Sequence, residues 1–536
     1  MRTQKTSVLL FAIVLLSLMA ILGSTQALAL PDLVVDSITP NCGGYLFANE
    51  SNEICAKIKN SGVDAAGAFH VSFVAGAFSE QVQVTGGLAA GANTTVCVTD
   101  PTLRNAGDSV AITVTADCNG AINESNETNN ASSVAKTVVN NGYKGKRYTS
   151  GNDITTWKTL ELQGDLLYST GDSIYLSGSS TPWTTYTANW TASDLLVPGT
   201  ATVKEARLYV IYNWDKVQGM PNNVSMSFNS VPQTRDAFYT DRKGYATSDY
   251  PYGMLTYNVT AAFSTAGNTA ILTNLNPTAG NPSLRGMLLV VIYEDANEPR
   301  RQIFINEEFD LLYGGTSACT TPEEATAWAP ITGPAIDLPW LANATLITVA
   351  PGAGPAEGDL IFNEQNWTDV WNYADDSQIG IDERDVKPYL EETGNLAGFQ
   401  SSADYMEASN AFLIVEELPA PAAEVYFVPE DIRIPKYCDT TDVSIWINTE
   451  DVITSGLMEF EYTYCCMNVT GYTINTTNWV PPSAMSLTPG KVRIILNAAG
   501  LGVGPGLLHV GNITVHCCND TGYCFTDLTW NKTTGA

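Results

Sequence analysis

Short runs of alternating apolar and polar residues, separated by clusters of Gly, Asn, Asp and Pro, recur along almost the whole chain. Examples are Val34–Ile38, Ala111–Ala116, Ala206–Tyr212 and Lys491–Leu496. Successive side chains of a strand point to opposite faces, so such alternation indicates half-buried β-strands. Long helical periodicity is absent beyond the first thirty residues. The predicted fold class is therefore all-β, a chain of tandem β-sandwiches.

The first 29 residues have a different pattern. Arg2 and Lys5 precede an apolar run from Val8 to Leu22, and small residues stand at Ala27 and Ala29, before the expected cleavage point. This is the pattern of a secretory signal peptide, and the run is short for the alternative, an uncleaved membrane anchor. No later segment has the length and apolarity of a span. We expect an exported, extracellular or cell-surface protein with no membrane span after cleavage.

The composition is strongly acidic. Lys and Arg total 26 against 56 Asp and Glu, which gives a formal net charge of -30 and a pI near 4.3. Such a charge repels nucleic acid and anionic lipid and favours cations and solubility. Nucleic-acid partners are therefore excluded.

Asn-X-Ser/Thr motifs are frequent, and in an exported chain they are acceptors for N-glycans on surface loops. We expect a glycosylated surface. The acceptor candidates are Asn49, Asn93, Asn123, Asn126, Asn130, Asn189, Asn223, Asn258, Asn343, Asn366, Asn468, Asn475, Asn512, Asn519 and Asn531.

The eleven cysteines form two groups with Cys319 alone between them. In an exported protein such groups are disulfide candidates, and no Cys/His spacing typical of zinc or haem is present. Each end of the chain is predicted to be a separately stapled module, with the pairing left open, and Cys319 to be a free thiol or an intermolecular link. The candidates are Cys42, Cys55, Cys97, Cys118, Cys438, Cys465, Cys466, Cys517, Cys518 and Cys524.

The chain after the signal is too long for one hydrophobic core, because single cores rarely exceed roughly 250–300 residues. A Pro/Ala-rich hinge follows Leu418 and marks one boundary. The predicted organisation is a signal peptide over 1–29, then domains over 30–140, 143–330, 331–418 and 423–532.

The first module, residues 30–140, carries Pro31-Asp32-Leu33-Val34-Val35 at its start and Lys59-Asn60-Ser61-Gly62 after a strand. It ends in an Asn/Glu/Ser-rich tract over 119–130. On these features it resembles the CARDB family, the immunoglobulin-like, adhesion-related domain of prokaryotic surface proteins. The polar tract is typical of a solvated loop before the last strand, with calcium binding as the alternative.

The middle region contains an internal repeat. Ala206–Val210, Ser227–Asn229, Gly267-Asn268 and Leu288–Val291 recur in order as Ala344–Ile347, Ile361–Asn363, Gly394-Asn395 and Phe412–Val415. A period well above a hundred residues predicts two tandem sandwiches rather than a solenoid.

The same region carries Tyr239-Thr240-Asp241-Arg242-Lys243-Gly244-Tyr245, Asn306-Glu307-Glu308-Phe309-Asp310 and Ala403–Ala408. These segments resemble an uncharacterised domain family of surface proteins of methanogenic archaea, which implies a cell-surface setting and no particular activity.

The last module, through strands such as Asp442–Ile447 and Gly511–Val515, resembles a cohesin-like jelly-roll sandwich. Its six cysteines depart from the cohesin pattern.

Catalytic motifs are scarce. The chain has three histidines, none in a nucleophile- or metal-directed motif, and it has no nucleophile elbow or phosphate loop. A glycosidase needs only two carboxylates, for which Glu307, Glu308 and Asp310 are candidates, although solvated loops explain most acids in so acidic a chain. We predict that the protein is not an enzyme and has no catalytic or cofactor-binding residues.

Calcium is the one cofactor we consider, because hard cations prefer several carboxylates on a loop. The candidate ligands are Asp375, Asp376, Asp382 and Asp385. The spacing does not match an EF-hand.

Aromatic residues are the last class of candidates. Eight tryptophans could stack on sugars, although sandwich cores normally hold such residues. They are Trp157, Trp183, Trp190, Trp214, Trp367, Trp371, Trp446 and Trp479. Tyr239–Tyr252 is predicted to be an exposed recognition loop.

The function predicted is a non-catalytic structural or adhesion role at an archaeal surface. Its partners are other surface proteins or copies of itself, and the alternative is a carbohydrate- or partner-binding module.

Overall fold

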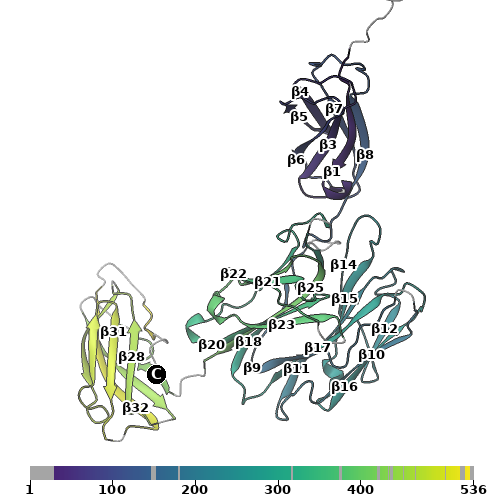
Figure 1. The fold of residues 1–536 in the computed structure, drawn as a ribbon. Coiled ribbons are helices and arrows are strands. Elements are labelled where there is room, and N and C mark those ends of the chain that lie inside the picture. The colour runs from purple at the N-terminus through teal and green to yellow at the C-terminus, as the bar shows by residue number, and fades with distance from the viewer. Residues whose placement is uncertain are drawn as a thin grey trace, which may run out of the picture.

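The computed structural model describes residues 29–530 except 146–151, 179–180, 316–317, 374–376, 419–422, 433, 435–438, 451, 465, 501 and 519–525. The signal peptide, Asp375, Asp376, Cys438, Cys465, Cys524, Asn519 and Asn531 lie outside these residues. Within them the regular structure is β-strand with a few 3-10 turns (Figure 1), so the all-β prediction is confirmed. No described helix has the length and apolarity needed to cross a membrane.

The first domain is a sandwich of two sheets, ordered β1-β3-β6 and β2-β8-β7-β4-β5. Strand β3 shows why these residues fold this way, because every second residue from Asn52 to Asn60 is buried in the core between the sheets. The elements are β1 (Leu33–Pro40), η1 (Cys42–Gly44), β2 (Leu46–Phe47), β3 (Asn52–Asn60), β4 (Phe69–Ala75), β5 (Phe78–Val84), β6 (Asn93–Asp100), β7 (Ser109–Ala116) and β8 (Ala131–Val139).

The middle domain is built on a nine-stranded sheet with the order β14-β15-β11-β17-β9-β18-β25-β20-β23. Its first-half elements are β9 (Thr156–Ser169), β10 (Thr185–Thr191), β11 (Thr202–Asn213), β12 (Val224–Phe228), β13 (Val231–Gln233), β14 (Ala237–Arg242), β15 (Pro251–Asn258), η2 (Thr260–Ala262), β16 (Gly267–Asn274) and β17 (Ser283–Glu294). Its second-half elements are β18 (Arg300–Tyr313), β19 (Thr326–Pro330), η4 (Leu338–Trp340), β20 (Leu341–Pro351), β21 (Gly358–Phe362), β22 (Gln365–Trp367), β23 (Ile379–Asp385), η5 (Lys387–Tyr389), β24 (Leu396–Ser401) and β25 (Tyr405–Glu417).

The two halves repeat one another strand by strand. A four-stranded sheet ordered β10-β16-β12-β13 belongs to the first half, and one ordered β19-β24-β21-β22 to the second. Asn229 and Asn363 lie at equivalent turns, both with positive φ, and their side chains donate to the equivalent Asn268 and Asn395 at 2.9 and 3.0 Å. The predicted internal repeat is therefore a structural duplication.

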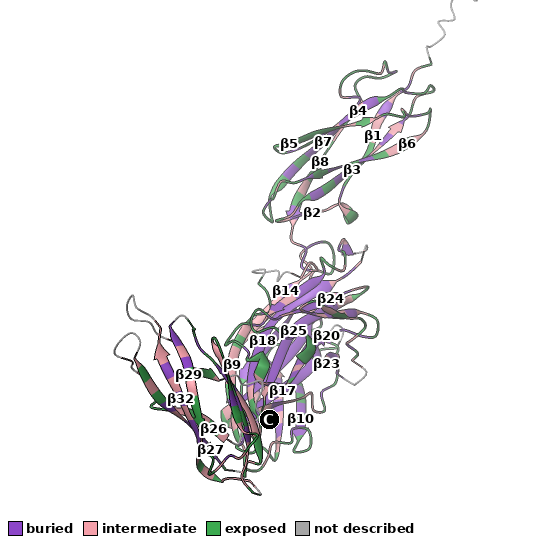
Figure 2. Ribbon diagram, turned by 90° about the vertical axis from the view of Figure 1, so that its left-hand side faces the viewer, coloured by how far each residue is buried: buried purple, intermediate pink, exposed green. Residues whose placement is uncertain are grey.

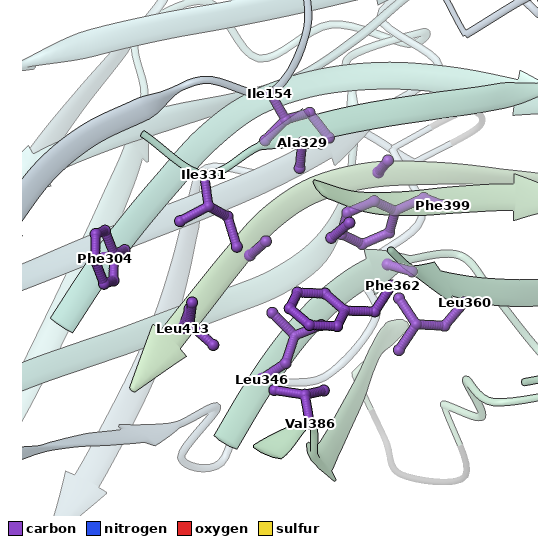
Figure 3. Close-up of a cluster of buried hydrophobic side chains, with 14 of the residues drawn as sticks. Ile154, Phe304, Ala329, Ile331, Leu346, Leu360, Phe362, Val386, Phe399 and Leu413 are labelled. Carbon is purple, nitrogen blue, oxygen red and sulfur yellow. The ribbon is translucent and has the colours of Figure 1, made fainter. Parts of the chain in front are cut away.

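Three hydrophobic cores lie between these layers. The first-half small sheet and the second-half small sheet each enclose one with the large sheet, and Figure 3 shows part of the second-half core around Phe362, Phe399 and Leu413. The third core joins strands of both halves through residues such as Tyr209 and Phe412, whose ring centroids lie 6.4 Å apart. Burial on both faces explains why the central strands are almost continuously buried (Figure 2).

The predicted boundary at residue 330 does not match the sheets. Strands β18 and β19 precede that boundary, yet both pair with second-half strands, β25 and β24. Strand β9 pairs with both halves: Thr156–Gln163 with β18 and Gly164–Ser169 with β17. Residues 152–418 therefore form one duplicated domain rather than two consecutive ones.

The last domain is a sandwich of sheets ordered β26-β27-β32-β29 and β30-β31-β28-β33. Its core includes Trp479, which is fully buried. The strands are β26 (Ala423–Val428), β27 (Thr440–Thr449), β28 (Ser455–Glu461), β29 (Met467–Ile474), β30 (Ala484–Thr488), β31 (Lys491–Asn497), β32 (Gly506–Cys517) and β33 (Thr529–Trp530).

Candidate functional site

The predicted calcium cluster has two described members, and they do not converge. Asp382 and Asp385 are three positions apart on strand β23, so their side chains leave opposite faces. Both carboxylate oxygens of Asp382 accept hydrogen bonds from Arg384, at 2.7 and 3.0 Å. Oδ1 of Asp385 accepts the backbone N–H of Lys387. These two carboxylates therefore cannot coordinate one calcium ion together.

The candidate acids of the enzyme alternative, Glu307, Glu308 and Asp310, are all buried inside the middle domain. The Glu307 carboxylate accepts bonds from Nε and Nη2 of Arg207 at 2.7 and 2.5 Å, and from the hydroxyls of Tyr209 and Tyr239 at 3.0 and 2.8 Å. Asp310 is also fully buried. Burial raises the pKa of the Tyr209 hydroxyl well above its usual value, so it stays a donor. Glu307 and Asp310 are therefore part of the core, and neither side chain is exposed at the surface.

The disulfides correct the prediction for Cys319. Cys319 is bonded to Cys42 of the first domain, across 277 residues, and is neither a free thiol nor an intermolecular link. Cys55 pairs with Cys97 on adjacent strands β3 and β6, while Cys118 is a free thiol. The first domain is therefore stapled to the middle domain as well as within itself. In the last domain Cys466 is disulfide-bonded.

Aromatic residues surround the staple between the first two domains. The Tyr245 ring lies 5.0 Å from that of Tyr45 and 5.2 Å from that of Phe47, centroid to centroid. Tyr245 also donates to the carbonyl of Ala318, and burial raises the pKa of its hydroxyl to about 12. The prediction of an exposed recognition loop over Tyr239–Tyr252 is wrong, because its two ends belong to strands β14 and β15 and Asp241, Tyr245 and Tyr252 are buried. Tyr245 is buried against the first domain.

A lysine completes this inter-domain contact. Lys144 Nζ lies 2.8 Å from Glu50 of the first domain and 3.2 Å from Glu324 of the middle domain, and 5.2 Å from the centre of the Phe47 ring. Because Lys144 and Glu50 are largely buried, this ion pair is less screened than a surface pair. Covalent, aromatic and ionic contacts together hold the two domains in one arrangement.

Most described acceptor asparagines are exposed or half-buried, as glycosylation requires. Asn130 is the exception. It is 8% exposed, and its Nδ2, the atom that would carry a glycan, donates to Glu124 at 2.6 Å. The folded first domain does not present this motif.

A groove of about 360 Å³ opens on the middle domain beside Gly164–Ser169. Strand β9 forms one wall, and β18, β20, β23 and β25 form the rest. Its lining residues are Asp165, Leu166, Leu167, Tyr168, Arg301, Asn343, Thr345, Ile347, Glu383, Ile414 and Glu416. The lining combines the apolar Leu166, Leu167, Ile347 and Ile414 with a larger set of charged and polar side chains.

Acidic groups outnumber basic ones in this groove. Arg301 pairs with Glu416 at 2.7 Å and lies 3.6 Å from Asp165, while Glu383 accepts the Tyr168 hydroxyl at 3.0 Å. Burial raises the pKa of Asp165 although Arg301 opposes the shift. The groove therefore offers two more negative than positive groups to a ligand at neutral pH.

The last domain presents a second polar surface. Tyr426, Trp446 and His509 are paired across strands β26, β27 and β32 on the face that points away from the core. The rings of Trp446 and His509 lie 4.7 Å apart. Next to them, Oδ1 of Asn512 accepts bonds from Ser444 Oγ at 2.8 Å and, in the tautomer that donates, from His509 Nε2 at 3.1 Å. We call these five residues the aromatic face.

Sequence reasoning missed the groove. Its residues come from five strands, and nothing in the local sequence links Asp165 with Glu383. The internal repeat was the one available signal, because it aligns Thr345 with Arg207 and so indicates that the halves differ at this position. Of the candidate sugar-stacking tryptophans, the structure buries Trp183, Trp190, Trp371 and Trp479 and leaves Trp157, Trp214, Trp367 and Trp446 partly exposed.

Comparisons with known proteins agree with the two domain resemblances. Residues 30–134 match the CARDB family model. A solved domain (residues 272–376) of a candidate cell surface protein from Methanosarcina acetivorans is 30% identical; the match covers 20% of this chain and 92% of that one, with a TM-score of 0.18. The CARDB domain of a Pyrococcus furiosus protein, solved with two metal ions, is 18% identical over 21% of this chain and 97% of that one, with a TM-score of 0.18. No curated protein is similar to the chain.

The duplicated middle domain matches a further family model. The model covers residues 142–416, just over half of the chain, and spans both halves of the duplication. Its description is "Protein of unknown function (DUF3344)". The predicted resemblance to an uncharacterised family is thus confirmed, and the chain belongs to the DUF3344 family, with a CARDB domain at its amino-terminal side.

Proposed function

We propose that this protein is a non-catalytic structural or adhesion component of an archaeal cell surface. The observation that carries the proposal is the Cys42–Cys319 disulfide, which joins two domains across 277 residues. Disulfides persist in oxidising compartments such as the cell exterior. A covalent tie between domains also suits a part that must keep its shape outside the cell.

Three further features support an extracellular setting. The amino-terminal pattern is that of a secretory signal, and the net charge of -30 favours solubility. Of the thirteen acceptor asparagines within the described residues, twelve are exposed or half-buried. The methanogen setting and the cohesin-like character of the last domain come from the sequence resemblances. The M. acetivorans relative is itself described as a candidate cell surface protein.

The fate of the most plausible catalytic acids supports a non-catalytic role. Glu307 is saturated by bonds from Arg207, Tyr209 and Tyr239. A general acid or nucleophile must reach its substrate, whereas Glu307 is 2% exposed. Its partners make it part of the core.

Localisation and redox state test this proposal together. Cells producing the full chain are fractionated and labelled on intact surfaces, and the purified protein is mapped for disulfides without reduction. Surface labelling with a Cys42–Cys319 peptide pair is the expected result. Recovery from the cytoplasm with both thiols free would contradict the proposal.

Carbohydrate recognition by the aromatic face is the second candidate function. Tyr426 is exposed and Trp446 half-buried, and such rings can stack on the apolar faces of sugars. Asn512, Ser444 and His509 add hydrogen-bonding groups beside the rings. A sugar chain fits this combination of rings and hydrogen-bonding groups.

A glycan array with the full chain tests this second function. Trp446→Ala should abolish any binding seen with the wild type, and Trp367→Ala, a partly exposed tryptophan of the middle domain, is the matched control. Binding that survives Trp446→Ala would exclude the aromatic face.

A further inference from the structure

In the described part of the middle domain, a strand edge that is paired in the second half has no paired neighbour in the first half. Strand β18 borders β25, and Gly164–Ser169 borders the equivalent β17. The outer edge of β18 is paired with Thr156–Gln163. Among the described residues, Gly164–Ser169 has a ladder partner on one side only. The N–H of Gly164 donates to the Pro299 carbonyl at 3.2 Å and its carbonyl accepts Arg301 Nη1 at 2.6 Å, so the open edge begins after Gly164. One edge strand therefore lacks the neighbour that its counterpart has.

The sheet faces behind these two edges are in equivalent register. Arg207 lies between Asn258 and Val290 on the neighbouring strands, and its counterpart Thr345 lies between Asp385 and Ile414. A bulge occurs at the same place in both, after Val203 and after Leu341. Glu205 and Arg207 of the first half therefore correspond to Asn343 and Thr345, which line the groove.

In the first half, the neighbouring strand covers this position. Trp157 lies over the guanidinium of Arg207, 3.8 Å from ring centre to Cζ, and Lys158 Nζ lies 2.5 Å from Glu205. An extended segment with an aromatic and a basic residue thus closes the first-half site. It pairs in antiparallel register with β18 while it does so.

In the second half, the equivalent sheet face at Asn343 and Thr345 is not covered by any described strand and lines the open groove. Three carboxylates, Asp165, Glu383 and Glu416, face it against one cation, Arg301. A basic residue from an added strand would meet complementary charge there. Strand addition to an exposed sheet edge supplies the backbone hydrogen bonds, and pockets for alternate side chains supply selectivity.

We propose that this groove and the open edge of residues 165–169 bind an extended polypeptide segment of another molecule, carrying a basic residue, as an added antiparallel strand. The molecule's own Thr156–Gln163, which pairs with the second-half strand β18 and covers Arg207 of the first half, shows that an added antiparallel strand suits such a position. The basic residue of the occupant is argued from the three carboxylates of the groove, because Asn343 and Thr345 replace the partners of Lys158 and Trp157 there. The inference is independent of where the protein resides and of its being non-catalytic.

The test uses the full chain, made in a host that does not glycosylate it, and a labelled synthetic peptide with the sequence of Thr155–Gln163, TTWKTLELQ. Fluorescence anisotropy should report saturable binding that weakens with added salt, because the attraction is screened. Replacing the peptide lysine by glutamate should weaken binding by about tenfold or more. Hydrogen exchange should slow at Gly164–Ser169 when the peptide binds.

Two matched variants locate the contact. Glu383→Lys reverses a charge at the groove and should weaken binding by about tenfold, whereas Glu364→Lys, an exposed acid outside the groove, should leave it unchanged. Thermal melting confirms that both variants are folded, and the peptide series remains informative if one is not.

Several results would overturn the proposal. They are no saturable binding, equal binding of the lysine and glutamate peptides, or protection elsewhere than Gly164–Ser169. No binding would assign Asp165, whose Oδ1 accepts the Leu166 N–H at 2.7 Å, to blunting this edge against association. Loss of binding in natively glycosylated protein with a glycan at Asn343 would show that the chain's own glycan occupies the groove.

Discussion

The two halves of the middle domain share a frame and differ in what fills it. Arg207 and Thr345 occupy the same place in the sheet, yet the first is buried in ionic and aromatic contacts and the second faces an open groove. The first half also has an additional edge strand, β14, whose Tyr239 and preceding Asp236 contact Glu307 and Arg207.

The difference shows that backbone register and side-chain chemistry diverge separately after a duplication. Main-chain pairing and the Asn229 and Asn363 turns are kept, because they satisfy backbone groups in both halves. The residues of the core that joins the two halves can differ, provided that each buried charge has a partner. The site around Arg207 is a closed core, and the equivalent site around Thr345 is an open groove.

The largest expected effect comes from breaking the closed site. Glu307→Ala leaves the buried Arg207 without its main partner and should lower the free energy of unfolding by about 3–5 kcal/mol. Glu383→Ala, at the open site, should cost no more than about 1 kcal/mol. Denaturant unfolding of the two variants gives the comparison, and similar losses would contradict it.

A buried carboxyl between the halves predicts a pH dependence of similar size. Burial raises the pKa of Glu407 to about 7 although Arg285, 2.7 Å away, opposes the shift. The unfolded carboxyl loses its proton near 4.5, whereas the folded one keeps it until about 7. The contribution to stability is therefore complete below pH 4.5 and falls by about 3 kcal/mol as pH rises to 7.

Unfolding curves of the wild type and of Glu407→Gln from pH 4.5 to 8 measure this contribution. The difference between the two proteins should change across the window and flatten above it. A difference that is constant with pH would show that Glu407 does not hold its proton in the folded state.

The equivalent turns of the two halves predict two smaller losses of stability that are equal to one another. Asn229→Ala and Asn363→Ala each remove a side chain that satisfies backbone groups at a turn with positive φ. Each should cost about 1–3 kcal/mol, with the two values within about 1 kcal/mol of each other. Calorimetry of the single and double variants checks this, and a strongly unequal pair would break the structural equivalence of the halves.

The smallest effect is expected at the groove wall. Tyr168→Phe removes the hydroxyl that donates to the exposed Glu383. Because water can replace this bond, the change should lower stability by only about 0.5 kcal/mol. A thermal shift assay against wild type is sufficient, and a loss above about 2 kcal/mol would mean that the groove is a packed interior.

The sequence alone was enough for the strand framework of this molecule. Alternation predicted the strands, and the paired Phe228-Asn229 and Phe362-Asn363 segments marked equivalent turns, because both the buried ring and the turn amide are required by local geometry. The CARDB resemblance was likewise local, since its residues lie within one domain.

Contacts between distant segments could not be predicted in the same way. Cys319 stands alone in the sequence, and its partner is 277 residues away. Strand β9 divides between two halves at Gln163-Gly164, where no breaker other than the glycine marks the change. Tyr245 lies in a polar segment that is typical of an exposed loop until the first domain is placed on it. Each of these is fixed by tertiary packing and not by local preference.

The Cys42–Cys319 bond also defines a mechanical route through the molecule. Tension applied between the start of the first domain and the last domain passes from Cys42 directly to Cys319, so the chain between them carries no load while the bond is intact. At about 3.5 Å per extended residue, the segment closed by the disulfide would be roughly 90–100 nm long, and this length does not extend while the bond is intact. A filament or anchor built from such units would resist pulling with short extension, and reducing agents would act on it as a length control.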